Sequence, residues 1–313
     1  MLNRSPSPLH VVAPWLAGVF LAAGALLLFL PLPWSPSGRL ALCLWDGLHL
    51  PFVAAAMLAG TYLVRRGLGV RLRPWQLAGA GAVMTVVAEF LQPLAGRSES
   101  ARDAFFGICG SGTAAALLAA ARASSRGRRR GAMALAALFV LAAGIPPGLI
   151  LADRAAARRG FPRLASFETR LELARWKFRD CSGRRVAHHA TDGGHALAVS
   201  VTRTADFPML TLGDGLGDWS GTRALALDAW VPGTQALDLH LRVDLPAEKT
   251  PPTQRCQTSV RLVPGWNHVT LPFAPWLGPF APSATVRPRR LVLYLRHGTA
   301  GDTFLLDNLR LMP

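Results

Sequence analysis

Residues 75–97 read WQLAGAGAVMTVVAEFLQPLAGR, an apolar run of roughly membrane-spanning length that ends in polar residues. An ionisable side chain inside such a run is costly unless it faces a partner or water, so Glu89 is the first candidate for function. If residues 75–94 form a helix, Glu89 and Gln92 share one face near its end. Arg97 and Asp103 follow just beyond that end and are expected to complete a polar cluster. A buried structural network that holds helices together is the alternative interpretation.

Four further apolar runs accompany this one, and each is near the minimum length for the hydrocarbon core. We therefore expect a membrane α-helical bundle of five transmembrane helices, at about residues 12–32, 48–64, 75–94, 104–121 and 132–151. The first run ends in Pro31-Leu32-Pro33-Trp34 rather than in a small-residue cleavage site, so we expect it to be retained. Pro146 and Pro147 are expected to kink or end the fifth helix.

The charge balance differs between the two halves of the chain. Through Arg163 there are seventeen basic and five acidic residues, a net of +12, and from Leu164 onward seventeen and thirteen, a net of +4. Because the arginines of the first half lie between apolar runs, they indicate membrane topology rather than nucleic-acid binding. They fill the connections after the second and fourth helices: Arg65, Arg66, Arg71, Arg73, Arg122, Arg126, Arg128, Arg129 and Arg130.

By the positive-inside rule these two connections and the N-terminus are cytoplasmic, and residues beyond about 152 lie outside. The basic residues at 154–163 mildly oppose this orientation. With it, the polar residues at the helix ends all converge on the outer membrane face: Asp46, His49, Glu89, Gln92 and Asp103.

Structural roles compete with functional ones at each of these positions. Asp46 and Asp103 fall near helix N-termini, where a carboxylate caps free N–H groups, and His49 fits a satisfied helix-end histidine. Glu89 lies at the far end of its helix, where negative charge is disfavoured. No metal-ligand spacing of the HExxH kind is present, so we expect neither a metal nor a cofactor; a metal site from His49, Glu89, Asp46 and Asp103 is the less favoured alternative.

These residues form an ordered set of motifs: Asp46-Gly47-Leu48-His49, Glu89-Phe90-Leu91-Gln92, Gly96-Arg97, and Asp103 with Gly110. The set resembles the VanZ-like membrane family over about residues 10–122. Gly47 stands where that family usually has Lys, and Gly107 stands where it usually has Asn, which removes an amide from the fourth helix. The resemblance implies a small bacterial inner-membrane protein, in some members linked to glycopeptide (teicoplanin) resistance, with no agreed reaction.

The pattern changes after a short charged stretch, 154–163, that we expect to be a juxtamembrane linker. Leu237, Leu239, Leu241 and Val243 alternate with polar residues, which predicts a strand with one buried face. Other predicted strands are Ala196–Thr202, Ala224–Val231, Thr258–Val263, His268–Phe273, Arg290–Arg296 and Phe304–Leu311. Many short strands with turn signals and no long amphipathic helix predict an antiparallel sandwich over residues 164–313.

Three motifs of this half are Gly217-Asp218-Trp219-Ser220, Val263-Pro264-Gly265-Trp266-Asn267 and Leu306-Asp307-Asn308-Leu309-Arg310-Leu311. They resemble carbohydrate-binding-module-like, galactose-binding-type jelly rolls, and the resemblance implies glycan binding. Sugar sites use aromatic faces, so the candidates are Trp219, Trp230, Trp266, Trp276 and Tyr294; packing in the core is the alternative for each tryptophan.

Two cysteines, Cys181 and Cys256, belong to the predicted outer domain, where an oxidising compartment permits a disulfide between them. The favoured function is that of an inner-membrane protein whose sandwich binds an envelope glycan or cell-wall precursor near the polar cluster. A membrane enzyme acting on a lipid-linked headgroup, with Glu89 as general base and Arg97 holding a phosphate, is one alternative. A non-catalytic envelope scaffold is the other. The expected partners are membrane lipid and glycan, and no catalytic motif is present.

Overall fold

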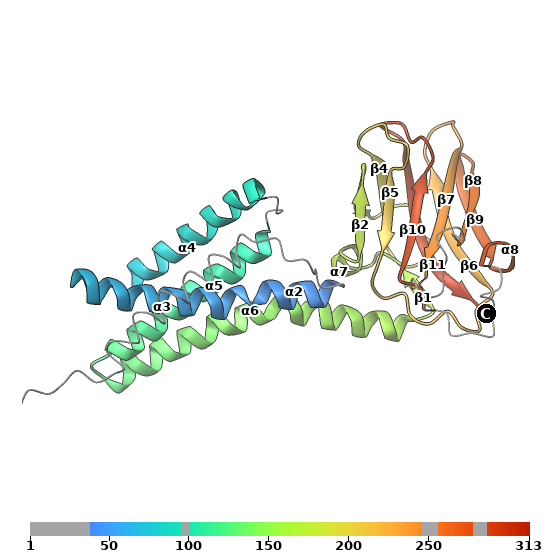
Figure 1. Cartoon of the computed structure of the whole chain (residues 1–313). Helices are drawn as coiled ribbons and strands as arrows, with labels where there is room; N and C mark the ends of the chain where they lie inside the picture. The colour runs from blue at the N-terminus through green and yellow to red at the C-terminus, as the bar shows by residue number, and fades with distance from the viewer. Residues whose placement is uncertain (1–37, 96–99, 246–255, 278–286) are drawn as a thin grey trace, which may run out of the picture. The chain divides into compact units, whose positions relative to one another are not determined.

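The structure is a computed structural model that describes residues 38–95, 100–245, 256–277 and 287–313. The chain divides into two compact units between Gly148 and Leu149. The first unit is helical, and the second is an antiparallel β-sandwich together with the last turns of the preceding helix (Figure 1).

The described part of the helical unit contains four segments that are long and apolar enough to cross a membrane. They are α2 (Arg39–Gly47) with α3 (His49–Leu68), α4 (Pro74–Leu91) with the 3₁₀ turn η1 (Gln92–Ala95), α5 (Ala101–Arg122) and α6 (Arg126–Gly160). The predicted helix at residues 12–32 lies outside the described residues. The other four predicted helices are present, although the first of these segments begins at Arg39 rather than at residue 48.

Helix α5 is the central helix of this unit and packs against both α3 and α4. Small residues allow this close approach, as is typical of helices that pack in lipid. A Cβ atom at Gly81 would lie 2.3 Å from Ser111 Oγ. On the other side of α5, a Cβ atom at Gly110 would lie 2.5 Å from the Leu50 carbonyl oxygen.

Helix α6 corrects the prediction of a linker at residues 154–163. Pro146 and Pro147 lie inside the helix and do not end it; it continues to Gly160, so most of the predicted linker is helical. Apolar helices tolerate proline because local adjustments satisfy the freed carbonyl groups. The end of α6 is held by a buried ion pair, in which Arg175 Nη2 lies 2.7 Å from Asp153 Oδ1. These last turns therefore belong to the sandwich unit.

The sandwich consists of two antiparallel sheets. Sheet A has the order β3-β4-β11-β6-β9, with β1 beside β11: β1 (Arg163–Ala165), β3 (Cys181–Val186), β4 (Ala196–Val201), β6 (Ala224–Val231), β9 (Gly265–Pro272) and β11 (Thr303–Met312). Sheet B has the order β2-β5-β10-β7-β8: β2 (Trp176–Arg179), β5 (Met209–Leu212), β7 (Leu237–Asp244), β8 (Cys256–Leu262) and β10 (Arg290–Leu295). Two single-turn helices, α7 (Arg170–Leu173) and α8 (Ala274–Leu277), lie in the connections. The predicted antiparallel sandwich is confirmed.

The core lies between the two sheets and follows the predicted alternation. Leu239, Leu241 and Val243 of β7 are buried, as are Leu291 and Leu293 of the neighbouring β10. The residues between them, such as His240 and Tyr294, therefore point away from the core on the outer face of sheet B.

Candidate functional sites

Five of the six predicted polar residues meet where helices of the first unit begin and end. We call Asp46, His49, Glu89, Gln92 and Asp103 the polar cluster. Asp46 lies at the end of α2, His49 begins α3, and Glu89 and Gln92 lie at the end of α4. Asp103 lies in the first turn of α5. The sixth residue, Arg97, lies outside the described residues.

Glu89 is buried at 8% exposure and accepts hydrogen bonds from two of the described residues. Gln92 Nε2 donates to its Oε1 at 2.9 Å, and the backbone N–H of Ser100 donates to its Oε2 at 2.9 Å. The shared face predicted for Glu89 and Gln92 is therefore present. Ser100 was not predicted, because a backbone donor leaves no signal in the residue type.

His49 and Asp103 lie beside this carboxylate. His49 Nδ1 lies 2.9 Å from the Asp46 carbonyl oxygen and 4.0 Å from Asp103 Oδ1. One ring nitrogen of His49 and one carboxylate oxygen each of Glu89 and Asp103 lie within 4.8 Å of one another. The cap of α5 is Ser100, whose Oγ accepts from Asp103 N–H, so the Asp103 carboxylate is left for the cluster.

Asp46 has a cationic neighbour that the sequence analysis did not single out. Arg102 Nη2 lies 3.2 Å from Asp46 Oδ2. Arg102 follows Ser100 at the start of α5, so the same turn supplies a guanidinium to Asp46 and a backbone donor to Glu89. The position of Arg102 next to the candidate Asp103 was the available sequence signal.

Two of the predicted glycan-binding tryptophans support the core instead. Trp219 is 2% exposed, its Nε1 donates to the Leu216 carbonyl at 2.8 Å, and its ring stacks on Phe273. Trp276 is half-buried against the core and meets Phe273 edge-on, at 5.6 Å between ring centroids. The buried Trp219 ring presents no open face to a sugar, which corrects the prediction for this residue.

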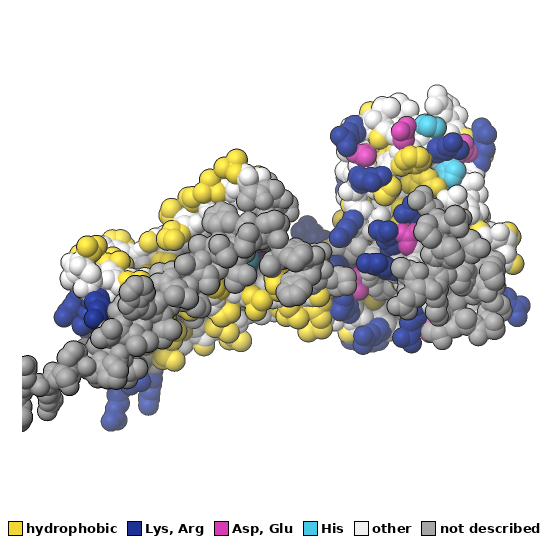
Figure 2. Space-filling view, in the orientation of Figure 1, with side chains coloured by type: hydrophobic (Ala, Val, Ile, Leu, Met, Phe, Trp, Pro, Cys, Tyr) yellow, Lys and Arg dark blue, Asp and Glu magenta, His cyan; other side chains and the backbone are white. Residues whose placement is uncertain are grey.

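Tyr294 lies on the outer face of sheet B, within a group of aromatic side chains. Its ring stacks on His240 at 5.0 Å, and Phe207 meets it edge-on at 5.9 Å. Asp244 beside them forms ion pairs with Arg242, at 2.8 Å, and with Arg290. We call these six residues the sheet-B face. Figure 2 shows a hydrophobic patch over β5 and β10 on this side of the sandwich, surrounded by charged and histidine side chains.

Trp266 lies on the outer face of the other sheet. It pairs in register with Trp230 across β9 and β6, and 41% of it is exposed. His189 stacks on Trp230 at 3.8 Å and meets Trp266 edge-on. This second aromatic group, Trp230, Trp266 and His189, is the sheet-A face. Trp266 and Tyr294 therefore cannot contact one sugar ring together.

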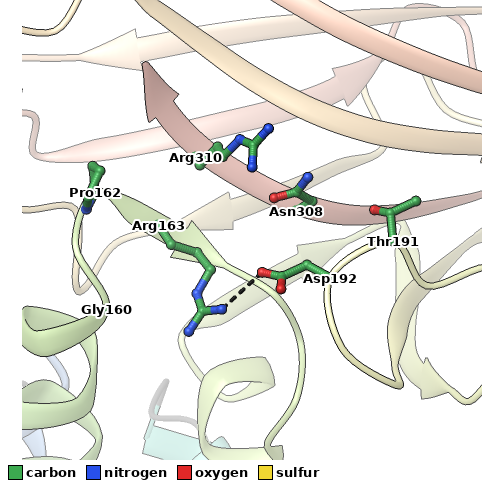
Figure 3. A pocket seen from close by; sticks show the side chains of 7 residues that line it. All are labelled: Gly160, Pro162, Arg163, Thr191, Asp192, Asn308 and Arg310. Atoms are coloured by element: carbon green, nitrogen blue, oxygen red, sulfur yellow. Dashed lines mark hydrogen bonds and ion pairs between the residues drawn. The ribbon is translucent and has the colours of Figure 1, made fainter. Parts of the chain in front are cut away.

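A pocket of about 420 Å³ opens near the start of the sandwich. It is lined by Gly160, Pro162, Arg163, Thr191, Asp192, Asn308 and Arg310 (Figure 3). Arg163 points across it to Asp192, with Nη1 at 2.9 Å from Oδ2.

Behind this pocket, two carboxylates share Thr191. Its hydroxyl lies 2.6 Å from Asp228 Oδ2 and its backbone N–H donates to Asp307 Oδ2. Burial raises the pKa of Asp307. Burial opposes ionisation of Asp228 too, but hydrogen bonds from Thr191, Asn308 and His268 hold its pKa below the usual value. The network fixes the loop before β4 onto sheet A.

The predicted disulfide is wrong, because Cys181 and Cys256 are both free. Cys181 lies on β3, an edge strand of sheet A, and Cys256 lies on β8, an edge strand of sheet B. β3 contacts β2, at the far edge of sheet B from β8, so the two cysteines lie at opposite edges of the sandwich. A disulfide requires the two Cα atoms to lie within about 7 Å of each other, which cysteines at opposite edges of the sandwich do not satisfy. Burial raises the pKa of both thiols.

No family model and no curated protein matches this chain. Solved structures match about half of the chain. A family 11 carbohydrate-binding module from Clostridium thermocellum, in complex with a β-1,3-1,4-mixed-linked tetrasaccharide, is 16% identical over 48% of this chain and 94% of its own, with a TM-score of 0.37. A family 28 module specific for non-crystalline cellulose is 11% identical over 49% and 93%, with a TM-score of 0.36. The C-terminal β-sandwich thus resembles carbohydrate-binding modules.

Proposed function

We propose that this chain is a bacterial inner-membrane protein of the cell envelope whose sandwich binds an envelope glycan or cell-wall precursor. The observation that carries the proposal is the sheet-B face. Tyr294 and His240 present stacked rings there, and within the described residues neither the Tyr294 hydroxyl nor a His240 ring nitrogen has a hydrogen-bond partner. These polar atoms are available to a ligand.

The chemistry of this face suits a sugar. A pyranose ring offers an apolar C–H face to an aromatic ring and hydroxyl groups to nearby polar side chains. Asp244 holds Arg242 and Arg290 in fixed positions beside the rings. Five strands spaced about 4.8 Å apart make the face roughly 19 Å wide, which fits several linked sugar units.

For the helical unit, we propose a VanZ-like membrane domain with a cytoplasmic N-terminus and an extracytoplasmic sandwich. The support is that five described polar residues of the VanZ-like motifs, far apart in sequence, form the polar cluster, and four of them are buried: Asp46, Glu89, Gln92 and Asp103. The arginines between the helices support the orientation.

The test is a glycan-binding screen on the purified full-length protein in detergent, followed by titration of the best ligand. Tyr294→Ala is expected to weaken binding about 2- to 12-fold, because an aromatic contact contributes roughly 0.5–1.5 kcal/mol. Trp266→Ala is the matched control on the opposite sheet and is expected to bind as the wild type does. Binding lost in Trp266→Ala but kept in Tyr294→Ala would move the site to the sheet-A face. A protein that binds no glycan contradicts the proposal.

A further inference from the structure

The polar cluster contains more buried negative charge than its described neighbours neutralise. Asp46, Glu89 and Asp103 are each less than one-tenth exposed. Arg102 pairs with Asp46, but in the described part of the chain no arginine or lysine forms an ion pair with Glu89 or Asp103. Burying two carboxylates without a cation is costly, so the cluster calls for a positive charge.

Three buried oxygen atoms of the cluster also lack hydrogen-bond partners among the described residues: Asp46 Oδ2, Asp103 Oδ1 and Gln92 Oε1. Arg102 lies beside Asp46 Oδ2, whereas no arginine of the described residues pairs with Asp103 Oδ1 or Gln92 Oε1. Gln92 is 1% exposed, and its amide group is held against Glu89 by the hydrogen bond from Nε2. Buried polar atoms are nearly always satisfied in folded proteins, so these two acceptors indicate a missing partner.

The donor set and its spacing fit a metal ion. A His49 ring nitrogen and carboxylate oxygens of Glu89 and Asp103 lie within 4.8 Å of one another. Ligand atoms bound to one zinc at about 2.0–2.2 Å lie roughly 3–4 Å apart, so side-chain shifts of about 1 Å complete the geometry. Calcium and magnesium prefer all-oxygen sites, whereas imidazole combined with carboxylates suits zinc.

We propose that the polar cluster binds one divalent transition-metal ion, with Zn²⁺ as the best fit, through His49, Glu89 and Asp103. Gln92 Oε1 or a water molecule takes the fourth position. The ligands come from three helices, α3, α4 and α5, so no short sequence motif contains them. A metal site of this kind therefore leaves no motif in the sequence by which it could be predicted. Three protein ligands with an exchangeable fourth position are typical of catalytic rather than structural zinc. The proposal is independent of glycan binding by the sandwich.

The test is metal analysis of the full-length protein purified in detergent, stripped with EDTA and reconstituted with Zn²⁺. We expect about one zinc per chain, and X-ray absorption of the wild-type protein should show a nitrogen and oxygen shell with imidazole scattering and no sulfur. Glu89→Gln and Asp103→Asn should each lower zinc occupancy at least about 10-fold at a fixed free Zn²⁺ concentration. Cys109→Ser, a buried thiol on α5, is the matched control and should keep its zinc.

The absorption measurement needs no variant, so the proposal stays testable if a substitution prevents folding. Less than about 0.1 zinc per chain after reconstitution, or a sulfur-containing shell, overturns it. The proposal is likewise overturned if the wild-type protein binds no metal and the Arg97→Gln variant melts at a lower temperature than the wild type. That result would identify the Arg97 guanidinium as the counter-charge.

Discussion

The ion pair between Asp153 and Arg175 determines how α6 joins the sandwich. Arg175 Nε lies 3.0 Å from both carboxylate oxygens of Asp153, and Nη2 lies 2.7 Å from Oδ1. The two side chains are 2% and 7% exposed. Asp153→Asn keeps the shape of the side chain but leaves the guanidinium buried without this carboxylate.

The expected cost is large. Breaking a buried ion pair by removing one partner typically costs about 3–5 kcal/mol. For a domain of this size, 1 kcal/mol shifts the melting temperature by about 2–4 °C. Asp153→Asn should therefore melt about 6–20 °C below the wild type.

Thermal unfolding of the full-length protein in detergent, followed by tryptophan fluorescence, measures this shift, since Trp176 and Trp219 are buried in the sandwich core. Asp214→Asn is the matched control. It breaks the Arg154–Asp214 pair, whose side chains are 31% and 15% exposed, and should shift the melting temperature by less than about 4 °C. Adding Arg175→Met to Asp153→Asn should recover most of the loss. An Asp153→Asn protein that melts within about 2 °C of the wild type refutes the reasoning.

Two further predictions concern the compartment and the thiols. A reporter active only outside the cytoplasm should be active when fused after Pro313 and silent when fused after Arg126; the reverse pattern contradicts the proposed orientation. Cys181 and Cys256 should both be found as free thiols by mass spectrometry, and both should react slowly with alkylating reagents at neutral pH because burial raises the pKa of each. A Cys181–Cys256 bridge in the native protein would contradict their positions at opposite edges.

The helices and strands that could be predicted from the sequence are those whose hydrophobic pattern has a single physical cause. Burial of one face produces the alternation of β7. The apolar runs were found by their length, and four segments of the described residues are long and apolar enough to cross a membrane. The missed strands lack that signal. β3 (CSGRRV) is an edge strand with arginines on both faces, and β5 has only four residues. Pairing with neighbours, which single-strand patterns do not contain, makes them strands.

The candidate sites divide in the same way. The polar cluster could be predicted because a carboxylate such as Glu89 is unusual in an apolar run. The sequence could not distinguish core tryptophans from tryptophans on an outer face of the sandwich, because Trp219 and Trp266 both occur in turn-like motifs with glycine. Which face each ring occupies depends on strand register: Trp266 pairs with Trp230 on the outer face, whereas Trp219 lies in a loop against Phe273.

One contact between helices sets the spacing inside the polar cluster. Gly107 lies one turn along α5 from Asp103, and Thr85 lies one turn along α4 from Glu89. A Cβ atom at Gly107 would lie 2.3 Å from Thr85 Cγ2 and 3.2 Å from its Cβ. Because residues four apart share a helix face, the distance between the backbones at this contact also sets how closely Glu89 can approach Asp103.

Gly107→Ala should therefore push α4 and α5 apart and weaken zinc binding without changing a proposed ligand. Thr85→Ala removes the methyl and hydroxyl groups, which would lie 2.3 and 2.8 Å from the added Cβ, and leaves only the 3.2 Å approach, so the double variant should regain zinc occupancy close to that of the wild type. Thr85→Ala alone, which breaks the hydrogen bond from Thr85 Oγ1 to Gly81 but leaves the helix spacing unchanged, is the control. If Gly107→Ala binds zinc as well as the wild type does, or if Thr85→Ala does not restore it, then the spacing of the carboxylates is not set by this contact.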